Sequence, residues 1–128
     1  MEMTLRFEIF PSDLDEVVDF YIRVLHFGVT KDQRHEPSAY VSMRRGAVQV
    51  GVVRKAVPED VPDARAARLP PAGVELVLEV DDVAGERDRV AAAGWPLEED
   101  LQDRPWGLTD FRILDPAGYY LRITSRAG

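Results

Sequence analysis

The sequence predicts an α+β fold of two βαβββ modules, whose curved mixed sheets carry helices on their outer face. Three observations indicate this fold. A strand-like alternation, an acidic helix start and a glycine stop occur once near the N-terminus and again after residue 74. Residues 57–73 hold four of the nine prolines and show no β pattern. We therefore expect one domain over residues 1–128, with module one at about 1–56, a linker at about 57–73 and module two at about 74–128.

Module one opens with a predicted strand at residues 5–10, in which apolar and polar side chains alternate. Its helix-facing side carries Leu5, Phe7 and Ile9. A helix follows, with Ser12 as its expected N-cap and Gly28 as its stop. Helical spacing places one apolar stripe toward the core: Leu14, Val17, Val18, Tyr21 and Leu25. Two further strands are predicted at residues 40–43 and 47–53.

Module two repeats this order. Its first strand is predicted at residues 74–80, with Leu76, Leu78 and Val80 on one face. The pair Asp81–Asp82 caps a helix that we expect to stop at Gly94. The last two strands are predicted at residues 110–114 and 119–124, joined by a proline- and glycine-containing turn.

Composition narrows the classes of function. The net charge of −7 argues against nucleic acid as a partner, since phosphate binding requires a basic surface. It suits a cationic small molecule, although it also serves solubility alone. The absence of cysteine excludes a thiolate nucleophile, a Cys-zinc site and disulfides. No apolar run approaches the roughly 20 residues of a membrane span and the N-terminus is no signal peptide, so we expect a cytoplasmic protein.

Short motifs in both halves resemble those of a known family. In the first half they are Asp13–Leu14, Asp19–Tyr21 and Leu25–Phe27; in the second they are Pro105–Gly107, Phe111 and Asp115–Gly118. Together they resemble the "DL…FY…LGF" opening and the "PWG…F…DPDG" close of the vicinal oxygen chelate superfamily. That family includes glyoxalase I, extradiol dioxygenases, fosfomycin-modifying transferases and the bleomycin resistance proteins, which bind a drug without altering it. The resemblance implies the two-module fold and a homodimer.

The resemblance also identifies where metal ligands would lie. In the family's metalloenzymes they come from the first and last strands of the modules, typically as His, His and Glu. Here those positions hold Arg6, Gln49, Glu75 and Arg122. A guanidinium stays protonated and offers no lone pair, so two of the four cannot bind a cation. The two histidines, His26 and His35, fall elsewhere, and we expect neither a metal nor a cofactor.

The same positions suggest a binding site. By strand parity, the concave sheet face carries Tyr40, Gln49, Glu75, Tyr120 and Arg122. Trp106 is added because it lies in a loop and because of the resemblance. We also expect an ion pair between Glu75 and either Arg6 or Arg122. A purely structural alternative stays open, in which the ion pairs fix the sheets and Trp106 only packs.

These observations favour a metal-free binding protein, resembling the bleomycin resistance proteins, that sequesters a bulky, partly aromatic antibiotic. The expected partners are a small aromatic or cationic ligand and a second copy of the chain, with no catalytic residue assigned. The alternative is an enzyme of the same family: a metal-dependent lyase, isomerase or dioxygenase, or a metal-independent catalyst with Glu75 or Glu79 as base. A sensor or a purely structural dimer is the third reading.

Overall fold

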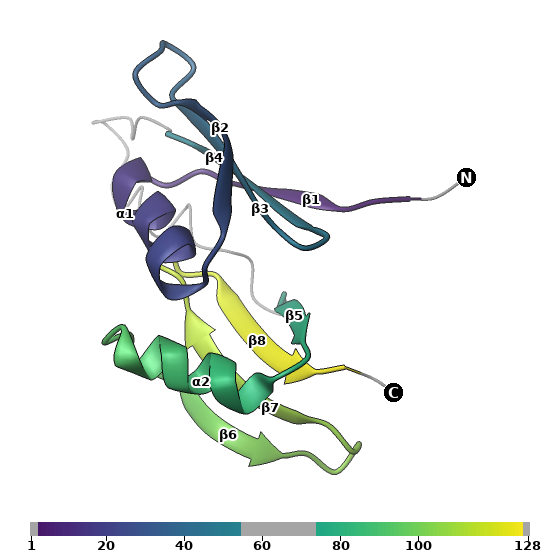
Figure 1. The fold of residues 1–128 in the computed structure, drawn as a ribbon. Helices are drawn as coiled ribbons and strands as arrows, with labels where there is room; N and C mark the ends of the chain where they lie inside the picture. Colours follow the sequence, from purple (N-terminus) through teal and green to yellow (C-terminus); the bar gives the residue numbers. More distant parts are fainter. Residues whose placement is uncertain (1–2, 55–73, 127–128) are drawn as a thin grey trace. The chain divides into compact units, whose positions relative to one another are not determined.

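Each half of the chain forms a four-stranded mixed sheet with its helix outside the sheet, which confirms the predicted α+β class (Figure 1). The structure, a computed structural model, describes residues 3–54 and 74–126. The chain divides into unit 1 (Met1–Leu69) and unit 2 (Pro70–Gly128). The linker expected at residues 57–73 lies outside the described residues. No helix in the part of the chain described is long and apolar enough to cross a membrane.

Unit 1 contains a sheet of strand order β1-β4-β3-β2. Its elements are β1 (Arg6–Ile9), α1 (Leu14–Asp19), the π-helical η1 (Phe20–Val24), β2 (Gly28–Gln33), β3 (Tyr40–Arg45) and β4 (Val48–Val53). Strand β1 runs parallel to β4, whereas the β4–β3 and β3–β2 pairs are antiparallel. All five residues of the predicted helical stripe are buried, at 1% exposure or less. This apolar stripe therefore forms part of the core of unit 1.

Three predictions within unit 1 were wrong. The helix is capped by Asp13, not Ser12, because the Asp13 carboxylate accepts the Glu16 amide at 3.1 Å. The helix does not run to Gly28, which instead begins β2; the left-handed residue at its end is His26, with φ of 60°. Leu5 is not in the core: it precedes β1 and is 76% exposed.

Unit 2 repeats the same plan with a longer helix. Its elements are β5 (Leu76–Val80), α2 (Val83–Ala92), β6 (Glu99–Asp103), β7 (Thr109–Leu114) and β8 (Tyr120–Ser125). The sheet order is β5-β8-β7-β6, with β5 parallel to β8. As predicted, Asp82 caps α2 by accepting the Gly85 amide at 3.0 Å, and Gly94 follows the helix with φ of 79°.

The core of unit 2 lies on the sheet face that α2 covers. Its fully buried members are Val90, Phe111, Ile113, Leu121 and Ile123. The first is on α2, and the others alternate along β7 and β8. Leu76 and Leu78, which the sequence alternation placed on one face of the strand, are only half-buried. The residues between the buried ones consequently point to the opposite face, where the polar side chains are found.

Candidate functional site

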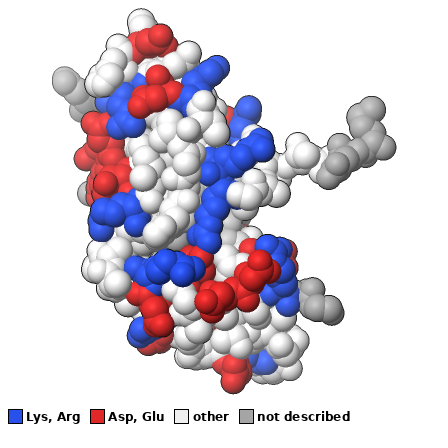
Figure 2. Space-filling view, in the orientation of Figure 1, with Lys and Arg blue, Asp and Glu red and all other residues white. Residues whose placement is uncertain are grey.

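The open sheet face of unit 2 carries a cluster of charged side chains. Strands β7 and β8 pair so that Arg112 lies opposite Arg122 and Asp110 lies opposite Thr124. Salt bridges join three arginines to three carboxylates: Arg104, Arg112, Arg122, Glu75, Glu99 and Asp110. We call this set the arginine cluster. In Figure 2, positive and negative side chains lie beside one another in several parts of the visible face.

Asp110 is the firmly held member of the arginine cluster. Its side chain is fully buried, and its Oδ1 lies 2.9 Å from Arg104 Nε and 2.8 Å from Arg104 Nη2. The hydrogen bond to Asp110 raises the pKa of Arg104 above its ordinary value. Glu99 forms ion pairs with two of the arginines: its Oε2 lies 3.2 Å from Arg112 Nε and 3.4 Å from Arg104 Nη2. A buried carboxylate held by a two-pronged guanidinium contact is a rigid anchor.

Glu75 is held much more loosely. Its Oε1 lies 3.6 Å from Arg122 Nε and 3.7 Å from Arg112 Nη1, beyond good hydrogen-bond distance. Among the described residues, Glu75 Oε1, Arg112 Nε and Arg122 Nε are buried and find no hydrogen-bond partner. Such groups carry a desolvation cost that a ligand or water would relieve. The predicted Arg122–Glu75 pair is therefore present, but it is not tightly closed.

Tyr120 borders the same cluster. The Arg112 Cζ lies 5.9 Å from the centre of its ring. Interaction with the Tyr120 hydroxyl is the largest cause of the raised pKa of Arg112. Tyr120 and Arg122 are two residues apart on β8, so they share a sheet face, as predicted. Three of the predicted site residues, Glu75, Tyr120 and Arg122, therefore belong to one charged and aromatic surface in unit 2.

Trp106 lies in the turn between β6 and β7. The turn is closed by two backbone hydrogen bonds, from the Arg104 amide to the Leu108 carbonyl at 2.8 Å and from the Gly107 amide to the Arg104 carbonyl at 3.0 Å. Gly107 has φ of 90°, a conformation that favours glycine. The Trp106 side chain is 56% exposed. In contrast, Trp95 is half-buried and donates its indole N–H to the Leu114 carbonyl at 2.8 Å.

The other two predicted site residues, Tyr40 and Gln49, lie in unit 1. Strand pairing places both on the face that also carries Glu8 and Gly51. Glu8 Oε1 pairs with Arg6 Nε at 3.1 Å, while Glu8 Oε2 is buried and without a hydrogen-bond partner in the described chain. A Cβ at Gly51 would lie 2.6 Å from Glu8 Cδ and 2.8 Å from Tyr40 Oη. Glu8 and Tyr40 therefore occupy the space that a side chain at position 51 would fill.

The predicted ligand positions of the related metalloenzymes do not suit a metal. Arg6 is paired with Glu8 within unit 1, and Arg122 is paired with Glu75 within unit 2. Two positive groups at these positions repel a cation and donate no electron pair to it. Across residues 3–54 and 74–126, no group of three or more His, Cys, Asp or Glu side chains is arranged to hold a metal ion. We derive no chemical step through a metal for this chain.

Sequence reasoning did not single out Gly51, Asp110 or Arg112 as parts of these faces. A signal existed for each. Glycine inside the strand pattern VQVGVV marks a place where another group approaches the backbone. The alternation DFRIL places Asp110 and Arg112 opposite Phe111 and Ile113, on the side away from the core. The six predicted site residues divide between the two units: Tyr40 and Gln49 lie in unit 1, and Glu75, Trp106, Tyr120 and Arg122 lie in unit 2.

Comparisons with known proteins agree on the fold. The family model described as the Glyoxalase/Bleomycin resistance protein/Dioxygenase superfamily matches residues 4–123. The structure of TioX from Micromonospora sp. ML1 is 26% identical, with a TM-score of 0.75, covering 98% of this chain and 100% of that one. A superfamily member from Sphaerobacter thermophilus DSM 20745 is 21% identical, with a TM-score of 0.71 and 98% of each chain covered.

One similar structure is that of an enzyme. The lactoylglutathione lyase from Agrobacterium tumefaciens is 20% identical, with a TM-score of 0.69, covering 98% of this chain and 94% of that one. At this identity the likeness shows the fold alone. A search of curated proteins finds no match in sequence.

Proposed function

Because the chain belongs to the glyoxalase/bleomycin resistance protein/dioxygenase superfamily, we propose that it binds and sequesters a bulky, partly aromatic small molecule without altering it. An antibiotic is the expected class of ligand. The observation that carries this proposal is the surface of unit 2, where buried charged groups with unused hydrogen-bonding atoms occur in the same unit as an exposed tryptophan. Ligand sites combine aromatic walls with a few polar groups that fix orientation.

Trp106 would supply the aromatic wall. Its ring is more than half exposed, although burying such a side chain would stabilise the fold by several kcal/mol at about 25 cal/mol per Å². The turn bonds hold its backbone in place, so little conformational entropy is lost when a flat ligand stacks on it. An exposed, well-positioned tryptophan favours ligand binding over packing.

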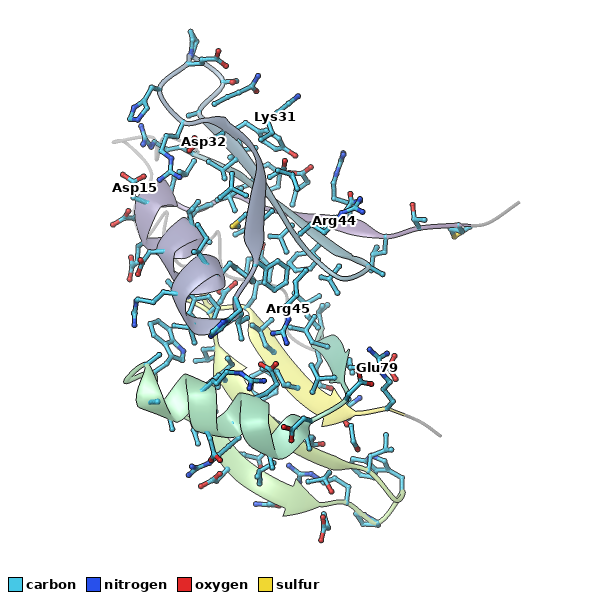
Figure 3. All side chains as sticks on the ribbon, in the orientation of Figure 1. Asp15, Lys31, Asp32, Arg44, Arg45 and Glu79 are labelled. Carbon is cyan, nitrogen blue, oxygen red and sulfur yellow. The ribbon has the colours of Figure 1, made fainter. Side chains whose placement is uncertain are left out.

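The polar part of the proposed site is Tyr40, Gln49, Glu75, Tyr120 and Arg122. Arginine at the positions of related metal ligands supports binding rather than metal-dependent chemistry. Glu75, one of the two candidate bases of the enzyme alternative, is engaged in ion pairs with Arg112 and Arg122. Glu79, the other candidate base, is exposed on β5 and is labelled in Figure 3.

We further propose a cytoplasmic homodimer. Strands β1 and β5 are each at one edge of a four-stranded sheet, so no strand of the described chain pairs with the outer side of either backbone. Exposed apolar side chains lie on or beside these edges, among them Leu5 and Val77. A second copy would cover both features. Sedimentation should give twice 14.4 kDa at tens of micromolar, and a monomer would contradict the dimer.

Binding without conversion is tested directly. The purified protein is titrated with a panel of aromatic antibiotics while tryptophan fluorescence is followed, and each bound compound is then recovered for mass spectrometry. We expect saturable binding of at least one compound, recovered unchanged. Elemental analysis is run on the same sample. A chemically altered compound, or about one zinc, iron or manganese per chain that is lost in Glu75→Ala, would instead identify an enzyme.

A further inference from the structure

Arg112 and Arg122 form a pair of guanidiniums that a single loosely held carboxylate separates. The two residues are register partners on β7 and β8, so their side chains leave the sheet side by side. Both are largely buried, with side-chain exposures of 18% and 25%. Within the described residues, neither Nε atom donates a well-aligned hydrogen bond, although Arg112 Nε lies 3.2 Å from Glu99 Oε2. Two guanidinium N–H donors that lack a well-aligned acceptor therefore lie together on one face.

Glu75 is the weakest-held acid of the arginine cluster. It precedes β5 and so is not fixed by the strand ladder. Its distances to the two arginines are 3.6 and 3.7 Å, whereas Asp110 approaches Arg104 to 2.8 Å. Its side chain is 31% exposed, whereas that of Asp110 is fully buried. Of these two carboxylates, Glu75 is the one that can swing away at little cost.

We propose that the Arg112–Arg122 pair is a binding site for the carboxylate of an aromatic ligand, and that Glu75 occupies this site until the ligand displaces it. This inference rests on the proposed binding function and names the charged group that the ligand carries.

Charge and geometry both support the exchange. With Glu75 in place, three arginines balance three carboxylates; without it, the cluster has one positive charge in excess, which a monoanion neutralises. A ligand carboxylate has two oxygens, and guanidiniums donate to such a group in paired, nearly planar hydrogen bonds. The ligand carboxylate can accept hydrogen bonds from Arg112 Nε and Arg122 Nε together, whereas the Glu75 carboxylate accepts a well-aligned hydrogen bond from neither atom.

The test compares two probes with the same ring and different charge, 2-naphthoate and 2-naphthamide. Calorimetry on the whole chain should show that 2-naphthoate binds about tenfold more tightly, a preference of about 1.4 kcal/mol, because hydrogen bonds to a charged group are stronger than those to a neutral one. Arg122→Gln should remove this tenfold preference for 2-naphthoate. Arg122→Lys should restore only part of it, because an ammonium group cannot donate two parallel hydrogen bonds to a carboxylate as a guanidinium does.

Glu75→Gln provides the decisive measurement. It should raise the affinity for 2-naphthoate by about 3- to 10-fold, because the competing carboxylate is gone, and leave 2-naphthamide nearly unchanged. The matched control is Glu79→Gln, which removes the same charge from an exposed position on β5 and should change either affinity less than about twofold. Thermal melts of all variants check that they are folded.

Three outcomes overturn the inference: equal affinity of the two probes, weaker 2-naphthoate binding in Glu75→Gln, or no saturable binding of 2-naphthoate at millimolar concentration. If the two probes bind equally and both lose affinity in Trp106→Ala, this result supports the aromatic site of the proposed function and contradicts the carboxylate site. Conversion of an antibiotic in the earlier panel would overturn the proposed function without touching the carboxylate preference.

Discussion

Arg112 and Arg122 lie directly opposite each other on two paired strands, an arrangement in which like charges repel. The carboxylates around them offset this repulsion unequally. Asp110 and Glu99 approach the guanidiniums from the β6 and β7 side, and Glu75 approaches from the start of β5. The firm and the loose contacts should therefore respond differently to mutation.

Asp110→Ala should lower the free energy of unfolding by about 3 kcal/mol, because the largely buried Arg104 loses its shortest ion pair and keeps only Glu99 at 3.4 Å and the Gln102 side chain at 3.1 Å. Glu75→Gln should cost less than about 1 kcal/mol, as expected for a partly exposed ion pair. Chemical denaturation of both variants measures the difference. Equal losses would mean that Glu75 is a structural residue and not an exchangeable one.

Gly51→Ala should destabilise the protein by about 1–3 kcal/mol, since the new methyl group meets Glu8 and Tyr40. In a Glu8→Ala background the same substitution should cost at least about 0.5 kcal/mol less, because one of the two obstacles is gone. Gly28→Ala is the control: its Cβ would meet only the Arg44 carbonyl, at 3.8 Å, so stability should hold. If Gly51→Ala lowers stability by the same amount in the parent chain and in the Glu8→Ala background, Glu8 does not lie over Gly51.

Most of the fold could be predicted because its signals are local. The alternation of buried residues on β7 and β8 and the acidic cap at Asp82 follow from periodicity and capping chemistry. Strands β2 and β6, whose residues we did not assign, are mostly exposed and polar, so they show no such alternation. The helix end was misplaced because His26, not a glycine, takes the left-handed conformation.

The candidate site was only partly predictable for a different reason. Parity assigned Tyr120 and Arg122 to the open face, but parity does not say which neighbours a long side chain reaches. Arg104 comes from the turn after β6 and meets Asp110 across six residues of sequence. That contact depends on the shape of the β6–β7 turn, which Gly107 sets through its positive φ.

The pKa of Asp100 links this hairpin to α2. Arg87 on α2 reaches β6 with two hydrogen bonds of 2.8 Å to the Asp100 carboxylate, and these lower the Asp100 pKa from 3.8 to about 2. The pair therefore stabilises the folded state fully above pH 3.8, and its contribution is lost as the pH falls through about 2. A pH titration that follows the Asp100 carboxyl carbon by NMR should give a pKa near 2, and Arg87→Gln should return this pKa toward 3.8. An unchanged midpoint in Arg87→Gln would show that the two side chains do not pair in solution.

Trp106→Ala should weaken binding of the aromatic ligand by about 1–3 kcal/mol, because stacking and buried area are lost together. Its thermal melt should be unchanged, since the side chain is 56% exposed and only its backbone holds the turn. Trp95→Phe is the matched contrast. It removes the indole hydrogen bond to Leu114 and should cost about 1 kcal/mol of stability while leaving the affinity intact. Fluorescence titration and melts on both variants separate the two roles. If Trp106→Ala unfolds the protein, or binds the ligand as tightly as the parent chain does, Trp106 is a packing residue and the ligand site lies elsewhere.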